Sequence, residues 1–475
     1  MKKLFSSKKS ESFLFYLSII LPFLLIKLSA LFFPREIRWD EAVYMSMGKY
    51  LFSFGEIGFW EPLRPILLPI INGFIWFLSL NQVLVGEIIM ILFSTGSLIV
   101  FYKLLSEFYD KKFSLFSTAI FAITPIFFYH GFYVFTEIPS LFFGLLSLYC
   151  FIKSRFFIAG IFSSLAFLTR FPQGIFFACI FLFLFWEIYK KKAKFSHLSN
   201  LILGFALPLL FFLTFNGLFY TNLSIQDRFF YPFSEASKYQ YSPLDNIKDP
   251  LLNIAYYFYE IPKDNLILLL SFVSIFFILK EKNHQKKLAF VFLLFLILWF
   301  SYHLSINNKQ LRFAIAVVPM LSYFSTTFLF LLFNKINKYQ RFVLIALISL
   351  LAISIIIKDI NFIFWREKIP ENVVRYYSYF SNKEGYIAIS DPVAGVFMDK
   401  KLEIIYDNPY VFYDSINKKD FDYILHSSHS LYCESYDEAC IQKIVEINTK
   451  LNSDFSIIYE TTNGKNIMRI YEKKK

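Results

Sequence analysis

Long apolar segments separated by short polar connections recur along most of the chain. Their residues form continuous blocks and do not recur at the i, i+3, i+4 spacing of soluble amphipathic helices. A reading window of about twenty residues assigns such blocks to helices that cross a membrane. The pattern therefore predicts a polytopic α-helical membrane protein with about eleven transmembrane helices, at residues 13–33, 83–105, 113–133, 138–151, 156–169, 174–189, 198–220, 265–279, 288–304, 313–332 and 342–357.

The pattern changes after residue 358. Short alternating runs such as EGYIAIS, LEIIYD and FDYILHSS are typical of strands, and FSIIYETTNGKNIMRIYEK predicts a hairpin around Asn463-Gly464. We therefore expect two domains. Residues 1–358 would form the transmembrane module, with external loops at 34–80 and 221–264, and residues 359–475 a small α/β domain outside the cytoplasm.

Composition supports a membrane protein. Apolar residues make up 56% of the 475 positions and charged residues only 18%, against about a quarter in soluble domains. The net charge of +12 does not indicate a nucleic-acid partner, because the basic residues stand in short clusters between apolar segments. With eleven helices, all the clusters fall on one side, which is then predicted to be cytoplasmic. The clusters are the N-terminus and residues 103–112, 153–155, 190–194, 280–287 and 335–341.

Carboxylates stand beside the apolar segments on the predicted external side. Asp40 and Glu41 follow the first segment in REIRWDEAVYM, and Glu137 opens the fourth in YVFTEIPSLFF. Such acids are often plain helix-end charges, and the helix dipole favours an acid in a first turn. A carboxylate at the membrane edge is nevertheless costly and often functional. All three are candidate catalytic residues, and Asp40 with Glu137 could also hold a divalent metal ion.

Basic residues occur on the same side, against the general trend. Arg170 lies in FLTRFPQG, and Lys309 and Arg312 lie in NNKQLRFAIAVVPML. Such residues can simply snorkel at helix ends. Three together favour an anion site, because arginine and lysine neutralise phosphate well. Further candidate substrate-binding residues on the external segments are Tyr44, Arg64, Asp227 and Arg228.

Two cysteines lie in the C-terminal domain. Cys433 and Cys440 could form a disulfide, as is common outside the cytoplasm. Together with His426 and His429 they could instead bind zinc, although the spacing matches no standard zinc site.

The segment RWDEAVYMSMGKYL…FWEPLRPILLPIING resembles the first external loop of membrane glycosyltransferases with the GT-C fold. The nearest branch contains the protein O-mannosyltransferases and the aminoarabinose transferases of lipid A. In that superfamily a pair like Asp-Glu follows the first span, and a double proline comes later; here Pro62 and Pro65 stand near that place, but not side by side. FTEIPSLFFGLLSLY, LTRFPQG and NNKQLRFAIAVVPML are similar to further family motifs, with Glu137 where many members carry Asp.

The resemblance implies transfer of a sugar from a polyprenyl-phosphate donor to an acceptor on the extracytoplasmic side, with inversion at the sugar carbon. The family chemistry would make Asp40 the base, assisted by Glu41 or Glu137. The three basic residues, or a bound divalent metal ion, would neutralise the phosphate that leaves. The acceptor could be a protein, a lipid or a glycan, and no other cofactor is implied.

Other functions stay open on the sequence alone. A flippase or transporter of lipid-linked sugars would also use charges in the membrane, but near its midplane and often in broken, paired helices. The sequence shows no such internal symmetry. A ligase or polymerase of surface polysaccharide, or an oligosaccharide transferase acting on asparagine, would share much of this pattern. The last class carries a WWDYG-like motif, which this chain lacks.

Overall fold

The computed structural model describes residues 14–240, 250–274, 283–304, 306, 309–380, 383–405, 409–428, 431, 433 and 437–474. The chain divides into two compact units. The helical unit comprises Met1–Phe33, Pro62–Leu67 and Glu87–Trp365, and the mixed unit comprises Pro34–Glu61, Leu68–Gly86 and Arg366–Lys475. The division at residues 358 and 359 that the sequence suggested stays a prediction.

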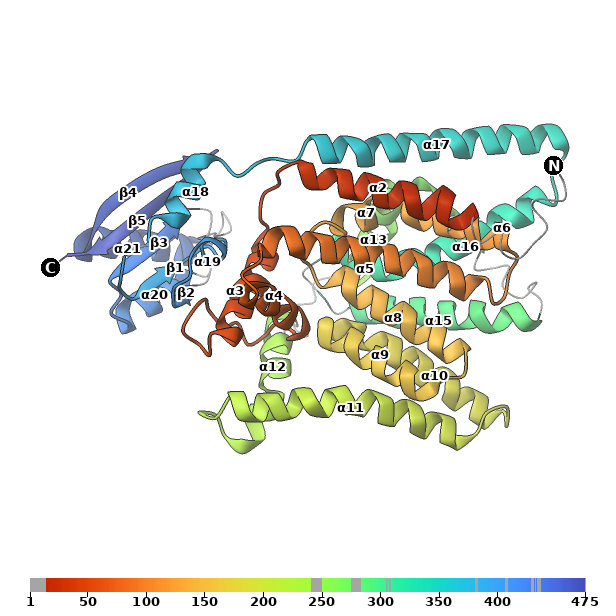
Figure 1. Cartoon of the computed structure of the whole chain (residues 1–475), viewed down its shortest axis with the longest axis horizontal. Coiled ribbons are helices and arrows are strands. Elements are labelled where there is room, and N and C mark those ends of the chain that lie inside the picture. Colours follow the sequence, from red (N-terminus) through yellow and green to blue (C-terminus); the bar gives the residue numbers. More distant parts are fainter. Residues whose placement is uncertain are drawn as a thin grey trace. The chain divides into compact units, whose positions relative to one another are not determined.

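The helical unit is a bundle of α-helices with short 3-10 segments and one π-helical turn (Figure 1). The first residues of α5 belong to the mixed unit. The elements are η1 (Tyr16–Ile20), α2 (Leu21–Ser29), η2 (Ala30–Phe32), α5 (Gln82–Leu105), α6 (Lys111–Ala122), α7 (Pro125–His130), α8 (Glu137–Ile152), α9 (Phe156–Thr169), η3 (Phe171–Gly174), α10 (Ile175–Tyr189), α11 (Phe195–Phe219), α12 (Ile225–Gln240), α13 (Pro250–Asp264), η5 (Leu266–Leu269), α14 (Leu270–Ser274), α15 (Asn283–Leu304), η7 (Leu311–Val317), α16 (Val318–Phe333) and α17 (Lys338–Phe364).

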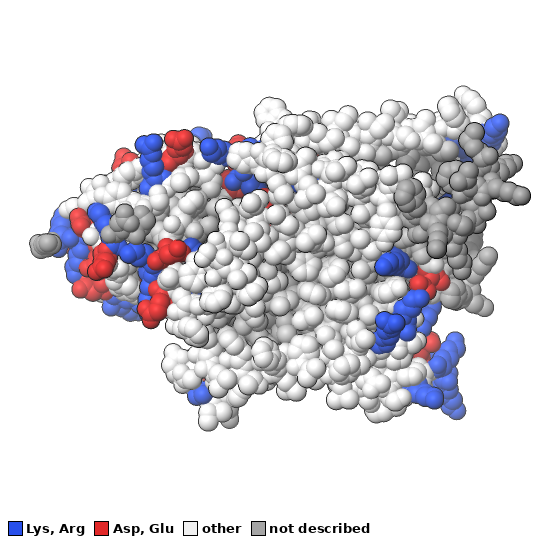
Figure 2. All heavy atoms as spheres, viewed as in Figure 1, with Lys and Arg blue, Asp and Glu red and all other residues white. Residues whose placement is uncertain are grey.

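The helical unit has the composition of a membrane-embedded module. Its visible face is almost devoid of charged side chains between the ends of the helices (Figure 2). The count of about eleven transmembrane helices and the cytoplasmic N-terminus stay predictions. Among the described residues, six helices are long and apolar enough to cross a membrane: Gln82–Leu105, Phe171–Tyr189, Phe195–Phe219, Gln285–Leu304, Leu311–Phe333 and Lys338–Phe364.

One predicted helix is divided in the structure. The sequence predicted a single helix over residues 113–133, whereas α6 ends at Ala122 and α7 begins at Pro125. Proline has no N–H for the helical hydrogen bond, and it disfavours helical backbone in the residue before it. Thr124 accordingly has extended backbone, with φ −70° and ψ 117°. The short helix α7 follows the break and ends at His130, and a non-helical stretch then leads to Glu137.

The segment predicted as an external loop at 221–264 contains two helices, α12 and α13. Residues 241–249 of this segment lie outside the described residues. On α13, Tyr257 and Ile261 are four positions apart and buried, whereas Tyr259 is 65% exposed. This one-sided burial is the mark of an amphipathic helix. The sequence analysis predicted a loop here because the segment is polar overall, although its apolar residues recur at helical spacing.

Small residues let two helices of the bundle approach closely. A Cβ at Gly160 of α9 would overlap the carbonyl of Leu201 on α11, and a Cβ at Gly204 would overlap the carbonyl of Phe157. Membrane helices commonly associate through such contacts, because lipid provides little hydrophobic drive for association. These glycines therefore fix the crossing of α9 and α11.

A buried lysine joins the first helix to the region before α8. Lys27 is fully buried on α2 and donates to the carbonyl of Phe128. Its ammonium lies 3.5 Å from the ring centroid of Phe132 and 4.3 Å from that of Phe128. It also interacts electrostatically with Asp359 of α17, which hydrogen-bonds to Tyr129. One buried network thus connects α2, α7 and α17.

The mixed unit is built around a five-stranded sheet with the order β2-β1-β3-β5-β4 (Figure 1). Strand β1 is parallel to β2 and β3, whereas β5 is antiparallel to β3 and β4. Its elements are α3 (Trp39–Phe52), α4 (Leu67–Phe77), α18 (Glu371–Ser378), β1 (Ile387–Ile389), α19 (Ala394–Phe397), β2 (Leu402–Ile404), α20 (Pro409–Lys418), β3 (Tyr423–Ser427), α21 (Glu438–Asp454), β4 (Phe455–Asn463) and β5 (Asn466–Lys473).

The predicted strands and hairpin are confirmed. Each alternating run contains a strand, and Asn463 pairs with Asn466 across a two-residue turn. Gly464 takes the positive φ of 60° that such a turn requires. The α/β character of the C-terminal region therefore follows from its alternation and its turn residues.

Residues from the segment predicted as the first external loop form part of the core of the mixed unit. Ala42, Val43 and Met47 of α3 are fully buried in one apolar cluster with residues of the sheet. Gly58 extends the sheet edge: its N–H donates to the carbonyl of Lys400 at 2.7 Å, and its carbonyl accepts from Leu402 at 3.0 Å. Residues that follow the first helix therefore fold together with the C-terminal domain.

Cys433 and Cys440 form a disulfide, with their Cα atoms 5.8 Å apart. The alternative zinc site required both of these thiolates, and its fourth residue, His429, lies outside the described residues. The bridge fastens the connection after β3 to the first turn of α21.

His426 makes the mixed unit sensitive to acid. Its imidazole is buried on β3, and burial, assisted by the charge of Arg469, lowers its pKa to about 4. In the unfolded chain the pKa is about 6.5. Between these values the unfolded chain binds more protons, so the free energy of unfolding falls as the pH falls, by up to about 1.4 kcal/mol per pH unit.

We therefore expect His426→Leu to remove this part of the pH dependence. Hydrogen exchange of the β1 and β3 amides, corrected for intrinsic rates, measures the stability of the sheet between pH 7 and pH 4. The control is His197→Gln, which replaces a half-buried histidine on α11 of the helical unit and leaves the sheet untouched. Equal slopes for His426→Leu and the unmodified protein would contradict the prediction.

Lys27→Met is expected to lower the thermal stability of the helical unit. The substitution keeps the length of the side chain but removes the cation–π contacts and the donor to the Phe128 carbonyl, together about 1–3 kcal/mol. Thermal unfolding of the purified protein in detergent measures the loss. Lys103→Met, at the exposed end of α5, is the matched control. An unchanged unfolding temperature for Lys27→Met would show that the network contributes nothing.

Candidate functional site

Glu137 is the first residue of α8 and is 3% exposed. Thr136 precedes the helix, and the approach through Phe132–Phe135 is buried and non-helical. A carboxylate suits this position, because the free N–H groups of a first turn carry partial positive charge. The local sequence thus explains why an acid is tolerated here, but a buried charge also needs a partner.

Two arginines supply that partner. The Nη1 atom of Arg170 lies 3.1 Å from Oε1 of Glu137, and the Nε atom of Arg312 lies 3.4 Å from the same oxygen. Arg170 also donates to the hydroxyl of Thr136 at 3.2 Å, and Arg312 to the side chain of Gln310 at 2.5 Å. Residues far apart in the sequence therefore meet at the start of α8.

Aromatic rings flank both guanidinium groups. The Cζ atom of Arg170 lies 4.7 Å from the ring centroid of Phe313, and that of Arg312 lies 4.9 Å from the centroid of Phe135. Ring faces attract cations and hold a guanidinium plane in one orientation. The two arginine side chains are 16% and 19% exposed. They are held in place while part of each remains accessible.

The charges of this triad do not cancel. Two guanidinium groups and one carboxylate sum to +1, which is suited to an anion with oxygen atoms. We call Glu137, Arg170 and Arg312 the arginine triad. Lys309 lies three residues before Arg312 and is half-buried.

Asp227 and Arg228 have other contacts. Ser224 donates to the Asp227 carboxylate at 2.6 Å. Arg228 donates to the carbonyls of Gly217, Thr221 and Leu223 at 3.0 to 3.4 Å. These contacts stabilise the turn between α11 and α12, and among the described residues none of them reaches the arginine triad. Of the other two substrate-binding candidates, Tyr44 is buried in α3 and Arg64 is half-buried in the turn before α4.

Asp40 and Glu41 of the mixed unit differ in how deeply they are buried. Both lie in the first turn of α3. Glu41 is fully buried; it pairs with Nη1 of Arg35 at 2.5 Å and accepts from the backbone N–H of Arg38 at 2.8 Å. Asp40 is half-buried. Glu41 therefore closes the start of the helix, as a helix-capping glutamate does, and Asp40 is the more accessible carboxylate.

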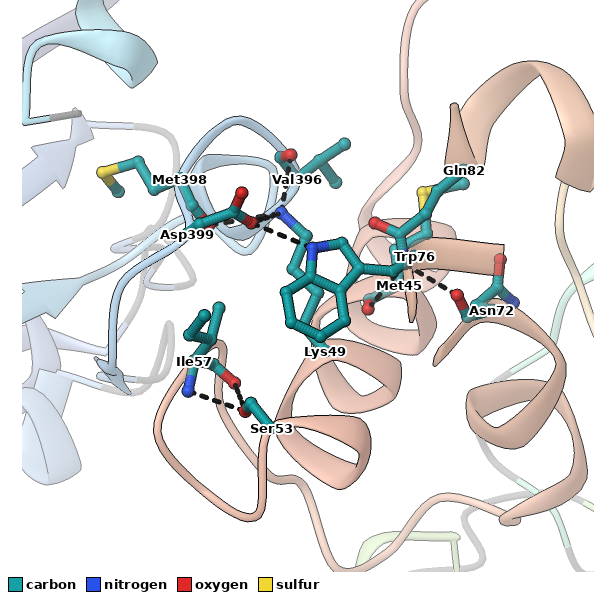
Figure 3. Close-up of polar contacts among 10 residues, drawn as sticks. All are labelled: Met45, Lys49, Ser53, Ile57, Asn72, Trp76, Gln82, Val396, Met398 and Asp399. Atoms are coloured by element: carbon teal, nitrogen blue, oxygen red, sulfur yellow. Dashed lines mark hydrogen bonds and ion pairs between the residues drawn. The ribbon is translucent and has the colours of Figure 1, made fainter. Parts of the chain in front are cut away.

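A second polar cluster fixes α3 (Figure 3). The ammonium of Lys49, almost fully buried, donates to the carbonyls of Val396 and Met398 and pairs with Asp399 at 2.9 Å. These bonds use all three ammonium protons. The Trp76 indole of α4 donates to the same Asp399 carboxylate at 3.2 Å. Burial lowers the pKa of Lys49, and the Asp399 charge partly offsets this effect.

The same view shows how α3, α4 and α5 are joined. The amide of Gln82 donates to the carbonyls of Met45 and Asn72, at 3.2 Å and 3.0 Å (Figure 3). A Cβ at Gly48 would overlap Gly73 of α4, so the two helices are in close contact. Together these contacts hold α3, which carries Asp40 in its first turn, in one orientation within the mixed unit.

The described residues offer no evident metal site. Within the described ranges, no group of three or more His, Cys, Asp or Glu side chains is arranged to hold an ion. Glu137, a candidate ligand from the sequence, lies instead between two guanidinium groups. Its surroundings do not fit a divalent cation.

Sequence reasoning missed Lys27. It is the one charged residue in the first apolar segment, and that isolation was a usable signal, because intramembrane charges are rare and usually face the protein interior. It contacts the Phe128–Phe132 region that leads to Glu137. It thereby supports the arginine triad without being part of it.

Part of the chain matches a known family model. Residues 64–215 match the model named dolichyl-phosphate-mannose-protein mannosyltransferase. The match includes Glu137 and Arg170 and ends before Arg312. No curated protein sequence matches the chain.

Solved structures match over much more of the chain. The ArnT structure from Cupriavidus metallidurans bound to undecaprenyl phosphate matches with a TM-score of 0.65 and 9% identity, covering 98% of each chain. The same protein in its apo state gives a TM-score of 0.61 at 10% identity, over 95% of this chain and 97% of that one. The Archaeoglobus fulgidus oligosaccharyltransferase in its apo form gives 0.59 at 14% identity, over 87% of this chain and 69% of that one.

The sequence identities to these solved structures are low, whereas the matches cover most of the chain. The matches agree with the apolar helices and the small C-terminal sheet. The chain is a polytopic helical membrane protein with the GT-C fold.

Proposed function

We propose that the chain is a glycosyltransferase that moves a sugar from a polyprenyl-phosphate donor to an acceptor on the extracytoplasmic side of the membrane. The observation that carries this proposal is the arginine triad, in which two partly accessible guanidinium groups share one buried carboxylate and leave a net charge of +1 on a GT-C scaffold. The names of the similar proteins support the donor class, since they mention dolichyl-phosphate-mannose and undecaprenyl phosphate. A protein, a lipid or a glycan would be the acceptor.

The donor chemistry matches the arginine triad. When the bond between the sugar carbon and the phosphate oxygen breaks, the electron pair leaves with the phosphate. A phosphate is already a stable anion, so the step needs positive charge more than a proton donor. Preorganised cations at that oxygen lower the barrier, because their charge is already oriented. Arg170 and Arg312 have this role in the proposal, with Lys309 as an additional phosphate contact.

Glu137 orients the two guanidinium groups. A carboxylate that forms ion pairs with two arginines is committed to these contacts and is poorly placed to accept a proton from a substrate. Its removal would leave two buried like charges without their common partner. We therefore assign Glu137 a positioning role in place of the catalytic role that the sequence suggested.

Asp40 takes the proton of the attacking hydroxyl. Glu41 is fully buried and pairs with Arg35 and the backbone of Arg38, whereas Asp40 is half-buried and therefore more accessible to an acceptor hydroxyl. The hydroxyl oxygen attacks the sugar carbon from the face opposite the phosphate, so the configuration inverts. The transition state has oxocarbenium character, as in glycoside hydrolysis.

Two other functions remain as alternatives. A lipid-linked sugar flippase would use the arginine triad to bind the same phosphate without breaking a bond. A ligase or polymerase of surface polysaccharide would use the same chemistry on a longer donor. Purified protein in lipid nanodiscs, given a panel of labelled polyprenyl-phosphate sugars, separates transfer from transport through the release of free polyprenyl phosphate.

Asp40→Asn is expected to lower donor turnover by about 10²- to 10⁴-fold, the usual contribution of a general base. The amide keeps the shape of the side chain but accepts no proton. Asp40→Glu should retain part of the activity, and Asp414→Asn, an exposed residue of α20, is the matched control. Undiminished turnover by correctly folded Asp40→Asn would remove this residue from the chemistry.

Arg312→Gln is expected to lower donor turnover by about 10²- to 10³-fold, as for the loss of one oriented charge at a leaving oxygen. The loss should appear in kcat more than in the KM for the donor. Arg341→Gln, in the exposed first turn of α17, is the control. If Arg312→Gln raises only KM, the arginine binds the donor but does not assist bond breaking.

A further inference from the structure

Two membrane helices enclose an apolar groove near one end of the helical unit. The first turns of α10 pack tightly on the middle of α15, where the rings of Phe176 and Phe295 are 4.5 Å apart and the thiol of Cys179 lies 3.3 Å from the carbonyl of Val291. Towards the end of α10 and the beginning of α15 they leave a cavity of about 850 Å³. We call this cavity the α10–α15 groove.

The walls of the α10–α15 groove are apolar and face outwards. Leu182 of α10 is 43% exposed, and Phe290 and Ile297 of α15 are each 53% exposed. Phe290 and Ile297 are two turns apart on one face of their helix. In a helix that crosses a membrane, exposed side chains of this kind contact lipid. The groove can therefore receive an acyl chain along its length.

One end of the groove is basic. Lys192, Lys286 and Lys287 line it, and Lys287 also packs over the rings of Phe151 and Phe183. Among the described residues, none of these three lysines forms an ion pair. Figure 2 shows Lys and Arg side chains gathered at this end of the helical unit.

The basic end of the groove has a net positive charge and an exposed tryptophan. Glu187 also lines the groove, so three ammonium groups and one carboxylate leave +2. Trp186 lies beside them and is 54% exposed. Tryptophan concentrates at the level of lipid head groups, where its ring is apolar and its N–H meets water. The end of the groove therefore lies at the depth of the phosphates of one membrane leaflet.

We propose that the α10–α15 groove binds an anionic phospholipid. One acyl chain lies against Leu182, Phe290 and Ile297, and the phosphate lies among the three lysines. The volume falls within the range of about 300–1,000 Å³ for ligand sites. The apolar walls favour a lipid over free phosphate. The net charge of +2 at the basic end favours an anionic head group over a zwitterionic one. This site uses none of the residues assigned to sugar transfer.

The test compares lipid retention by the full chain. Protein from nanodiscs of phosphatidylcholine with phosphatidylglycerol is transferred to detergent, and native mass spectrometry counts the lipids that remain. We expect selective retention of phosphatidylglycerol and about tenfold weaker retention by the double variant Lys192→Gln and Lys286→Gln. Lys287 stays unchanged because it packs on two rings.

Controls separate the head group from the groove. Lys335→Gln with Lys338→Gln removes two exposed lysines near the start of α17 and should leave retention unchanged. Ile297→Trp should fill the apolar wall and reduce retention while the lysines remain. Thermal unfolding verifies that each variant is folded.

Four results would overturn the proposal. The first is equal retention of both lipids by the unmodified protein, since the lysines would then select nothing. The second is full retention of phosphatidylglycerol by the folded lysine variant. The third is displacement by inorganic phosphate as effectively as by phosphatidylglycerol, which would indicate an anion site without a lipid. The fourth is a second copy of the chain that occupies the groove in place of lipid.

Discussion

A buried charge must be paired, and this constraint organises the helical unit. Glu137 is nearly inaccessible to solvent, so its carboxylate requires the guanidinium groups of Arg170 and Arg312. That requirement joins α8 to the segments that follow α9 and α15. Two guanidinium groups and one carboxylate leave a net charge of +1 on the triad. The same pairing therefore joins distant segments of the bundle and sets the charge of this region.

The mixed unit obeys a different constraint, since its core is assembled from both ends of the chain. α3 buries Ala42, Val43 and Met47 against residues of the C-terminal domain, and Gly58 continues the edge of the sheet. Lys49 of α3 adds an ion pair with Asp399. A substitution in the C-terminal domain can therefore change the position of α3, the helix that carries Asp40. The domain is part of the framework that orients this carboxylate within its unit.

Much of the fold was accessible from the sequence because apolar blocks and alternating strands are local patterns. The boundaries of α9 (Phe156–Thr169) and the hairpin beyond Asn463 follow from such patterns. The helices of residues 221–264 were missed because their polarity hid the spacing of Tyr257 and Ile261. Pairings such as Arg312 with Glu137 join residues far apart in the chain, and no local pattern contains their geometry. The sequence could place these residues on one side but could not bring them into contact.

The adjacent acids Asp40 and Glu41 could not be distinguished from the sequence. Asp40 and Glu41 have the same charge and follow the same apolar segment, so the sequence offers both as candidate bases. Glu41 is three residues beyond Arg38 and can therefore reach back to its N–H, whereas a side chain one position earlier is directed to another face of the helix. Helix geometry thus commits one acid to structure. Its neighbour Asp40 stays more accessible, although nothing in their residue types distinguishes the two acids.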